Sequence, residues 1–323
     1  MNHRAQILEW AEQGTLPPEG VRAALEIAGV TPDGLAWRRF LSGLFLWLGV
    51  LLVASGVIFF FAYNWDALSR VQKFGLVEAL LVTSIIVATV YGTERVAGQA
   101  TLFLASLLTG AWLALIGQTY QTGADPYELF GWWALLILPW SLVARLPSMW
   151  LLFVLLLNLT VALYFEAARG IFGFVFHWGS QAWALFLVNT LALVIWEAVG
   201  SLGWPWLQPR WAVRIVAAVS GIAATVLGVW GIFESGDVGS LAIPAYAGWL
   251  LAAYFVYRHL RKDLFVLAGG VLSAVVVVAS FLGHHMVRGA DEALGLLFIG
   301  LVVIAMSAGG AWWLTNIAAG EGE

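Results

Sequence analysis

Two short segments of the sequence gather polar and aromatic side chains of the kinds that bind a ligand. The first, residues 63–70, contains an Asn-Trp-Asp sequence, and the second, residues 117–130, contains Gln-Thr-Tyr-Gln followed by Thr-Gly. Amides, aromatic rings and a few charges around one opening are typical of a site for a polar or amphipathic ligand. The residues that we expect to form such a site are Asn64, Trp65, Glu78, Gln118, Tyr120 and Gln121.

Some acids and glycines in these segments have a structural explanation. Asp125 is followed by Pro126 and, three positions on, by Glu128, which is close to a capping box at a helix start. Gly123 could end the preceding helix in a left-handed conformation, and Asp66 could cap the helix that follows it. Three residues of the second segment are required by no capping rule: Gln118, Tyr120 and Gln121.

Glu78 is the one acid clearly displaced into an apolar run. It lies five residues after Lys73, which at the helical rise is about 7 Å further into the membrane. An acid within the hydrocarbon is costly and by default indicates function. Because Arg70 and Lys73 are near in sequence, two hypotheses stay open: an ion-paired anchor and a ligand-binding residue.

The elements that position these residues are predicted to be membrane helices. Hydrophobic residues make up 62% of the 323 and charged residues 11%, whereas about a quarter of residues are charged in soluble proteins. Runs of the roughly 20 apolar residues that span a bilayer recur along the chain. They cover residues 40–63, 74–91, 101–119, 126–144, 148–165, 180–199, 213–233, 240–257, 264–282 and 292–315. The sequence therefore predicts an all-α, polytopic integral membrane helix bundle of about ten transmembrane helices.

The distribution of basic residues predicts the orientation of this bundle. Short cytoplasmic loops hold the excess of Lys and Arg. With the N-terminus in the cytoplasm, only four basic residues lie outside: Arg70, Lys73, Arg169 and Arg288. The other eleven then lie inside, so both termini are expected to be cytoplasmic. Three parts follow: a cytoplasmic helical hairpin (1–39), helices one to four (40–145) and helices five to ten (146–323).

Small and polar residues within the spans predict where helices meet. Ser42, Gly49 and Gly56 recur at seven-residue intervals in the first span, and the seventh contains a comparable series. Small residues let helix backbones approach closely in a bilayer. The series in the seventh span is Gly221, Gly228 and Gly231. A further polar pair, Asn158 and Asn189, is expected to hydrogen-bond between helices.

Several classes of function are disfavoured. The chain has no cysteine, and its net charge of −4 offers no basic field for nucleic acid. The predicted spans contain no arginine ladder, which would indicate a voltage sensor, and no midplane chain of acids, which would indicate a proton relay. His284 and His285 lie near Asp291 and Glu292, but the spacing matches no zinc-binding helix. With no phosphate loop or nucleophile elbow either, we expect no enzyme, no cofactor and no metal.

The sequence resembles a family of bacterial predicted membrane proteins, the domain of unknown function DUF2157. The resemblance rests on Phe-Phe-Phe-Ala-Tyr-Asn-Trp-Asp at 59–66, Ile-Gly-Gln-Thr-Tyr-Gln-Thr-Gly at 116–123 and Leu-Phe-Gly-Trp at 129–132. It is clearest over residues 1–145. It implies a bacterial inner membrane, with the periplasm at the outer face, and no particular activity.

Two hypotheses of function follow. In the first, the outer loops bind or transport a small amphipathic molecule, a lipid or a periplasmic protein segment. In the second, the chain is an assembly or scaffold subunit for another membrane protein. The expected partners are the lipid bilayer and, under either hypothesis, another membrane or periplasmic protein; nucleic acid is not expected.

Overall fold

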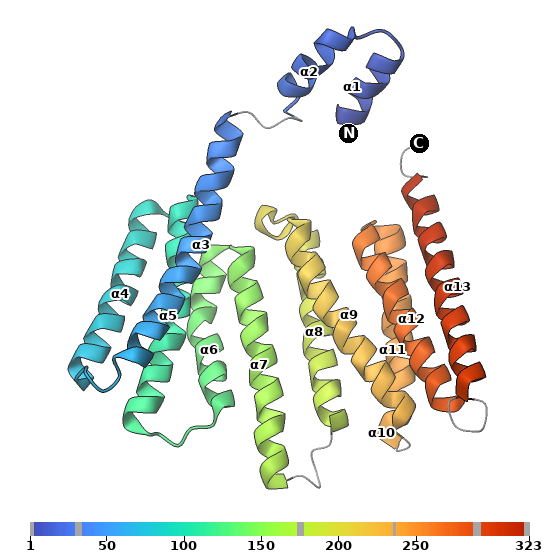
Figure 1. Cartoon of the computed structure of the whole chain (residues 1–323). Coiled ribbons are helices and arrows are strands. Elements are labelled where there is room, and N and C mark those ends of the chain that lie inside the picture. The colour runs from blue at the N-terminus through green and yellow to red at the C-terminus, as the bar shows by residue number, and fades with distance from the viewer. Residues whose placement is uncertain (1–2, 30–33, 173–177, 235–236, 287–291, 320–323) are drawn as a thin grey trace. The chain divides into compact units, whose positions relative to one another are not determined.

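The computed structural model describes residues 3–29, 34–172, 178–234, 237–286 and 292–319. In these ranges the chain is helical and contains no strand (Figure 1). The first helices are α1 (His3–Glu12), α2 (Pro18–Ile27), α3 (Gly34–Tyr63), α4 (Arg70–Tyr91), α5 (Val96–Tyr120), α6 (Pro126–Ala144) and α7 (Pro147–Phe172). The remainder are α8 (Trp178–Ser201), η1 (Pro205–Leu207), α9 (Arg210–Phe233), α10 (Asp237–Ser240), α11 (Ala242–Phe255), η2 (Val256–Leu260), α12 (Leu264–Met286) and α13 (Glu292–Ala319).

Nine helices within the described ranges are long and apolar enough to cross a bilayer. The predicted all-α polytopic bundle is therefore confirmed. The fourth and fifth predicted spans are separate helices, because the chain turns at Arg145, which has a left-handed backbone conformation (φ +51°).

The eighth predicted span is shorter as an α-helix than the sequence indicates. α11 has 14 residues, fewer than the roughly 20 needed to cross the hydrocarbon. It passes directly into the five-residue π-helix η2, which carries the helical path on to Leu260. A wider π-helical turn inside a helix is rare and often lies at a functional site.

The chain forms two compact units, Met1–Trp112 and Leu113–Glu323. In the first unit, α1 and α2 pack together as the predicted hairpin. α3 is 30 residues long and begins at Gly34, six positions before the predicted span, so Arg38 and Arg39 lie on the helix itself. It contacts α5 through the rings of Trp47 and Phe103, whose centroids are 5.4 Å apart.

The predicted small-residue seam of α3 has no partner helix within the first unit. A Cβ atom added at Gly49 or Gly56 would meet no atom within 4 Å. Ser42, the third member of the series, donates its hydroxyl hydrogen to the Arg39 carbonyl of the same helix. The prediction of a packing contact here is not met in the described structure, and this stripe of α3 is open.

In the second unit, α9 is the central helix and packs against α8, α11 and α12. The glycine seam predicted in this helix is confirmed. A Cβ atom at Gly228 would lie 2.9 Å from the ring of Tyr246, and one at Gly231 would lie 2.6 Å from the Cβ of Ala242. The missing side chains thus let α11 lie directly on α9.

Candidate functional site

The loop between α3 and α4 is held by a capping box at Ser69. The Ser69 hydroxyl accepts a hydrogen bond from the Gln72 backbone N–H, and the Gln72 side chain accepts one from the Ser69 N–H. Asp66 therefore does not cap this helix, contrary to the sequence-based expectation. Serine at N-cap with glutamine at N3 satisfies both exposed donors, so the local sequence offers a better cap three residues further on.

Lys73 and Trp65 form the first contact of the candidate site. Lys73 lies in the first turn of α4 and is buried, with 6% of its surface exposed. Its Nζ atom lies 3.5 Å from the centroid of the Trp65 ring. A cation over an indole face is favourable, and more so where water is excluded. This contact fixes the loop against α4 and uses the charge of Lys73.

Glu78 is hydrogen-bonded to a tryptophan rather than ion-paired in the part of the chain that the structure describes. The Trp112 Nε1–H of α5 donates to Glu78 Oε1 over 3.1 Å. Residues five apart on a helix lie about 140° apart around its axis, whereas those three or four apart are neighbours. Lys73 and Glu78 therefore point to different sides of α4, which explains why Lys73 does not neutralise the acid.

Asn64 has a local role in the structure. Its Nδ2 atom donates to the carbonyl of Phe60 over 2.9 Å. The same carbonyl also accepts from the Asn64 backbone N–H over 3.0 Å, so the two bonds together hold Asn64 at the end of α3. Of the three predicted site residues in the first unit, Trp65 and Glu78 thus contact other helices or loops, and Asn64 contacts its own helix.

The second polar segment begins where α5 ends. Gln121 has a left-handed backbone conformation (φ +45°), and the Thr122 N–H donates to the Gly117 carbonyl over 3.4 Å. This is the bonding pattern of a Schellman C-cap, in which the left-handed position usually belongs to glycine. The expectation that Gly123 ends the helix is therefore corrected, because Gln121 occupies that position, although Gly123 also has a positive φ.

The start of α6 is only partly as predicted. Asp125 occupies the N-cap position and Pro126 follows at N1, but the Asp125 side chain makes no capping bond. Instead its backbone carbonyl accepts from the Glu128 N–H over 3.0 Å. The Glu128 carboxylate accepts from the hydroxyl of its neighbour Tyr127 over 3.5 Å. The predicted capping box is therefore absent from this helix start.

Gln118 and Tyr120 lie on the last turn of α5 and are exposed. They belong to the second unit, as does Gln121, whereas Asn64, Trp65 and Glu78 belong to the first. The predicted contact between the two segments stays a prediction.

Comparison with known proteins identifies the N-terminal part of the chain. Residues 8–150 match the family model described as predicted membrane protein (DUF2157). The resemblance seen in the motifs is thereby confirmed, and the DUF2157 region extends from α1 to the start of α7. The searches of curated proteins and of solved structures found no match. Multi-pass membrane insertion follows from this match together with the nine apolar helices.

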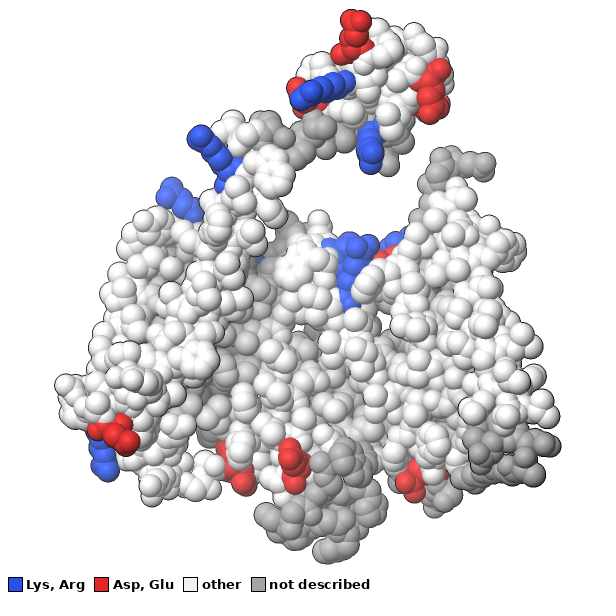
Figure 2. Space-filling model, viewed as in Figure 1, with Lys and Arg blue, Asp and Glu red and all other residues white. Residues whose placement is uncertain are grey.

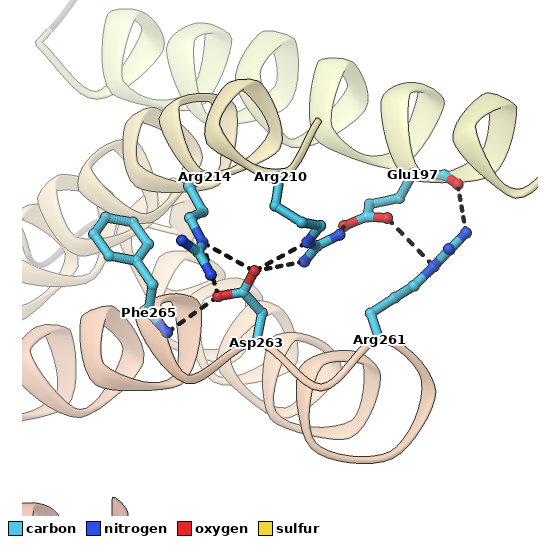
Figure 3. Close-up of polar contacts among 6 residues, drawn as sticks. All are labelled: Glu197, Arg210, Arg214, Arg261, Asp263 and Phe265. Carbon is cyan, nitrogen blue, oxygen red and sulfur yellow. Dashed lines mark hydrogen bonds and ion pairs between the residues drawn. The ribbon is translucent and has the colours of Figure 1, made fainter. Parts of the chain in front are cut away.

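A charged cluster outside the DUF2157 region was missed by the sequence reasoning. Asp263, which lies between η2 and α12, is buried, with 1% of its side chain exposed. Arg210 Nη2 donates to its Oδ2 atom over 2.8 Å, and Arg214 Nε donates to the same oxygen over 3.1 Å (Figure 3). The Phe265 N–H donates to its other oxygen over 3.1 Å. Asp263 thus joins the start of α9 to the start of α12 at one end of the second unit.

Glu197 of α8 completes the cluster. It accepts from Arg210 Nη1 over 3.1 Å and pairs with Arg261 Nε over 3.4 Å. Burial alone would raise the pKa of the Asp263 carboxyl, but the hydrogen bonds and positive charges of Arg210 and Arg214 outweigh burial and lower that pKa. The sequence carries a signal, because Glu197 and Asp263 lie near arginines at the span ends, but basic residues at span ends are also explained by orientation alone.

A line of polar side chains runs between the helices of the second unit. Asn158 and Asn189 exchange two hydrogen bonds of 3.0 and 2.6 Å, as the sequence predicted. The Ser220 hydroxyl accepts from Trp249 Nε1 over 3.0 Å and lies 3.2 Å from the Thr190 hydroxyl. Buried polar groups satisfied in this way hold helices in register.

No metal centre is formed by the described residues. They contain no group of three His, Asp or Glu side chains that could hold an ion. His285 Nδ1 lies 2.9 Å from the carbonyl of Phe281 in its own helix. Asp291, which the sequence placed beside it, lies outside the described residues.

Proposed function

We propose that this multi-pass membrane protein lies in the bacterial inner membrane and binds, without catalysing a reaction, a small amphipathic molecule at its outer face. Glu78 is the residue that the proposal places at the centre of this site. The ligand would supply a hydrogen-bond donor or a positive charge, such as an amine or a hydroxyl, to the Glu78 carboxylate.

The bonding of Glu78 carries this proposal. A carboxylate has two oxygens with about four acceptor positions. Within the described structure, the hydrogen bond to this carboxylate comes from Trp112 and reaches Oε1. One neutral indole does not compensate a charge within the hydrocarbon. An amphipathic ligand with a donor group would do so, and its apolar part would lie against the surrounding membrane helices.

The surroundings of Glu78 fit a preformed site. The Ser69–Gln72 capping box and the Trp65–Lys73 contact hold the loop and the first turn of α4 in place. Trp112 orients the carboxylate from α5. A fixed acid beside the amphipathic indole ring of Trp112 suits a ligand that has both a polar and an apolar end.

The distribution of charged residues supports the proposed orientation, and it can be examined in each unit separately. In the second unit, Arg210, Arg214 and Arg261 lie at one end, and Figure 2 shows acidic side chains at the opposite end of that unit. In the first unit, Arg38, Arg39 and Arg95 lie at the helix ends opposite the α3–α4 loop, whose side carries Arg70 and Lys73. Basic residues favour the cytoplasmic side, which places the α3–α4 loop outside.

An assembly role is a second candidate, and the open stripe of α3 favours it. Gly49 and Gly56 face no atom of the described chain within 4 Å of an added Cβ. Small residues on an open helix face are typical of helix–helix contacts in membranes. In this case another membrane protein would occupy the stripe, and Glu78 would pair with a donor of that protein.

Copurification tests the proposal and separates the two candidates. The wild-type chain, Glu78→Gln and the control Glu94→Gln, which alters an exposed acid at the other end of α4, are purified in detergent. Mass spectrometry then identifies the bound lipids, small molecules and proteins. A small amphipathic molecule present with wild type and Glu94→Gln but lost with Glu78→Gln supports the proposal. A protein lost on Gly49→Leu, with no small molecule dependent on Glu78, favours assembly instead.

A further inference from the structure

The arginine cluster at the end of the second unit keeps a positive charge and unused hydrogen-bond donors after its internal ion pairs are formed. Three arginines, Arg210, Arg214 and Arg261, face two carboxylates, those of Asp263 and Glu197. The cluster therefore carries a net positive charge. Figure 2 shows basic side chains gathered at this end of the unit.

Arg214 is the member with donors to spare. It contacts Asp263 through Nε alone, whereas Arg210 uses Nε, Nη1 and Nη2. The Arg214 side chain is 46% exposed, and its Cζ atom lies 5.8 Å from the centroid of the Phe265 ring. Asp263 thus holds the Nε edge of the guanidinium (Figure 3), and these bonds of Arg214 leave its two terminal NH2 groups available as donors.

The aromatic side chains at the same end locate the cluster at a membrane surface. Trp150 and Trp206 are stacked with ring centroids 6.3 Å apart, and Trp204 lies 6.0 Å from Trp206. Trp204 and Trp211 are each about half exposed, at 49% and 50%. Tryptophan favours the headgroup layer of a bilayer, so the arginines beside these rings lie at the depth of lipid phosphates.

We infer that this cluster is a binding site for the phosphate of an anionic phospholipid, with Arg214 as the principal ligand. A guanidinium with two terminal NH2 groups can donate two parallel hydrogen bonds to phosphate oxygens. Basic pockets between membrane helices are typical sites for anionic headgroups. The bound phosphate would face α9 and the α11–α12 connection, and Asp263 would keep Arg214 oriented toward it.

This site is independent of the proposed function. It lies outside the DUF2157 region and in the second unit, whereas Glu78 lies in the first unit. Loss of one site therefore leaves the other open to test.

Native mass spectrometry of the delipidated full chain tests this inference. Dioleoyl-phosphatidylglycerol and dioleoyl-phosphatidylcholine are titrated separately against wild type, Arg214→Gln and the control Arg95→Gln, which removes an exposed arginine of the α4–α5 connection. Wild type and Arg95→Gln should bind phosphatidylglycerol more tightly than phosphatidylcholine. Arg214→Gln should bind phosphatidylglycerol at least about fivefold more weakly, with phosphatidylcholine unaffected.

Two further measurements keep the result decisive. Arg214→Gln leaves Asp263 with its bonds from Arg210 and Phe265, and thermal unfolding checks that the variant is folded. If it is not folded, Arg214→Lys is measured instead. This variant keeps the charge but loses the paired donors, so it should bind phosphatidylglycerol at an intermediate level. Inorganic phosphate is added as a competitor. Unchanged phosphatidylglycerol binding in both variants would overturn the site, and displacement by inorganic phosphate at equal concentration would overturn the assignment to a lipid.

Discussion

Arg210 and Asp263 are 53 residues apart in sequence and are joined by a 2.8 Å hydrogen bond between Nη2 and Oδ2. The bond ties the start of α9 to the start of α12, and Arg210 extends the connection to Glu197 on α8. Because Asp263 is buried, the hydrogen bonds from Arg210, Arg214 and the Phe265 N–H stabilise its charge there. The ion pairs at this end therefore lock three membrane helices together.

Replacing Asp263 with asparagine should destabilise the second unit. The substitution leaves Arg214 without its anionic partner and Arg210 with Glu197 alone, and breaking a buried pair costs about 3 kcal/mol or more. We expect the lower end of that range, because the two arginine side chains are 33% and 46% exposed. Denaturant unfolding in detergent measures the change. Asp66→Asn, an exposed acid that caps no helix, serves as the control and should unfold like wild type.

The same carboxylate should make stability depend on pH. Its pKa in the folded protein is lowered below the ordinary aspartate value of 3.8, so the unfolded chain binds the proton more readily. The stabilisation is fully present above that ordinary value and is lost as pH falls through the lowered pKa. Unfolding midpoints measured from about pH 6 to about pH 3 should fall more steeply for wild type than for Asp263→Asn. Parallel curves would show that Asp263 does not contribute.

The Asn158–Asn189 pair should show measurable coupling. Each amide donates to the carbonyl oxygen of the other, so either single change to alanine removes both bonds and leaves the remaining amide bonded only to its own helix. Hydrogen bonds of this kind in membrane proteins contribute about 0.6 kcal/mol on average and about 1.7 at most. A double-mutant cycle on Asn158→Ala and Asn189→Ala should therefore give a coupling free energy in that range. Additive effects would mean that the reciprocal bonds add no stability.

The architecture was largely predictable from sequence because membrane insertion requires long apolar helices, and each such run is visible in the chain. Polar and small residues inside apolar runs also predicted the Asn158–Asn189 pair and the α9 glycine seam, but the same rule predicted a contact at Gly49 and Gly56 of α3 that the described structure does not contain. Boundaries set by local backbone geometry were not predictable. Gln121 adopts a left-handed backbone conformation that is unfavourable for a residue other than glycine. The π-helix that follows α11 is not predicted by the spacing of apolar residues.

The charged cluster escaped prediction for a different reason. Asp263 and its two arginine partners are separated by about 50 residues, and only the packing of α9 against α12 brings them together. From sequence, a basic residue at a span end is fully explained by orientation. The tryptophan partner of Glu78 was equally unpredictable, because Trp112 lies 34 residues away on a different helix.

Cysteine labelling should establish the orientation of the chain. The natural chain contains no cysteine, so single substitutions are specific. Gln121→Cys and Glu234→Cys should react with a membrane-impermeant reagent from the periplasm, and Arg95→Cys and His259→Cys should not. Reversed labelling at two of the four sites would overturn the proposed topology.

The fraction of intact protein that retains a bound molecule tests the role of Glu78 most directly. Native mass spectrometry of the wild-type chain, gently extracted from the membrane, should show a population heavier by the mass of one small amphipathic molecule. Glu78→Gln should lose that population, Glu78→Asp should keep part of it, and Glu94→Gln should match wild type. If Glu78→Gln retains the bound molecule in the same proportion as wild type, Glu78 is not the residue that binds it and the proposed site is wrong.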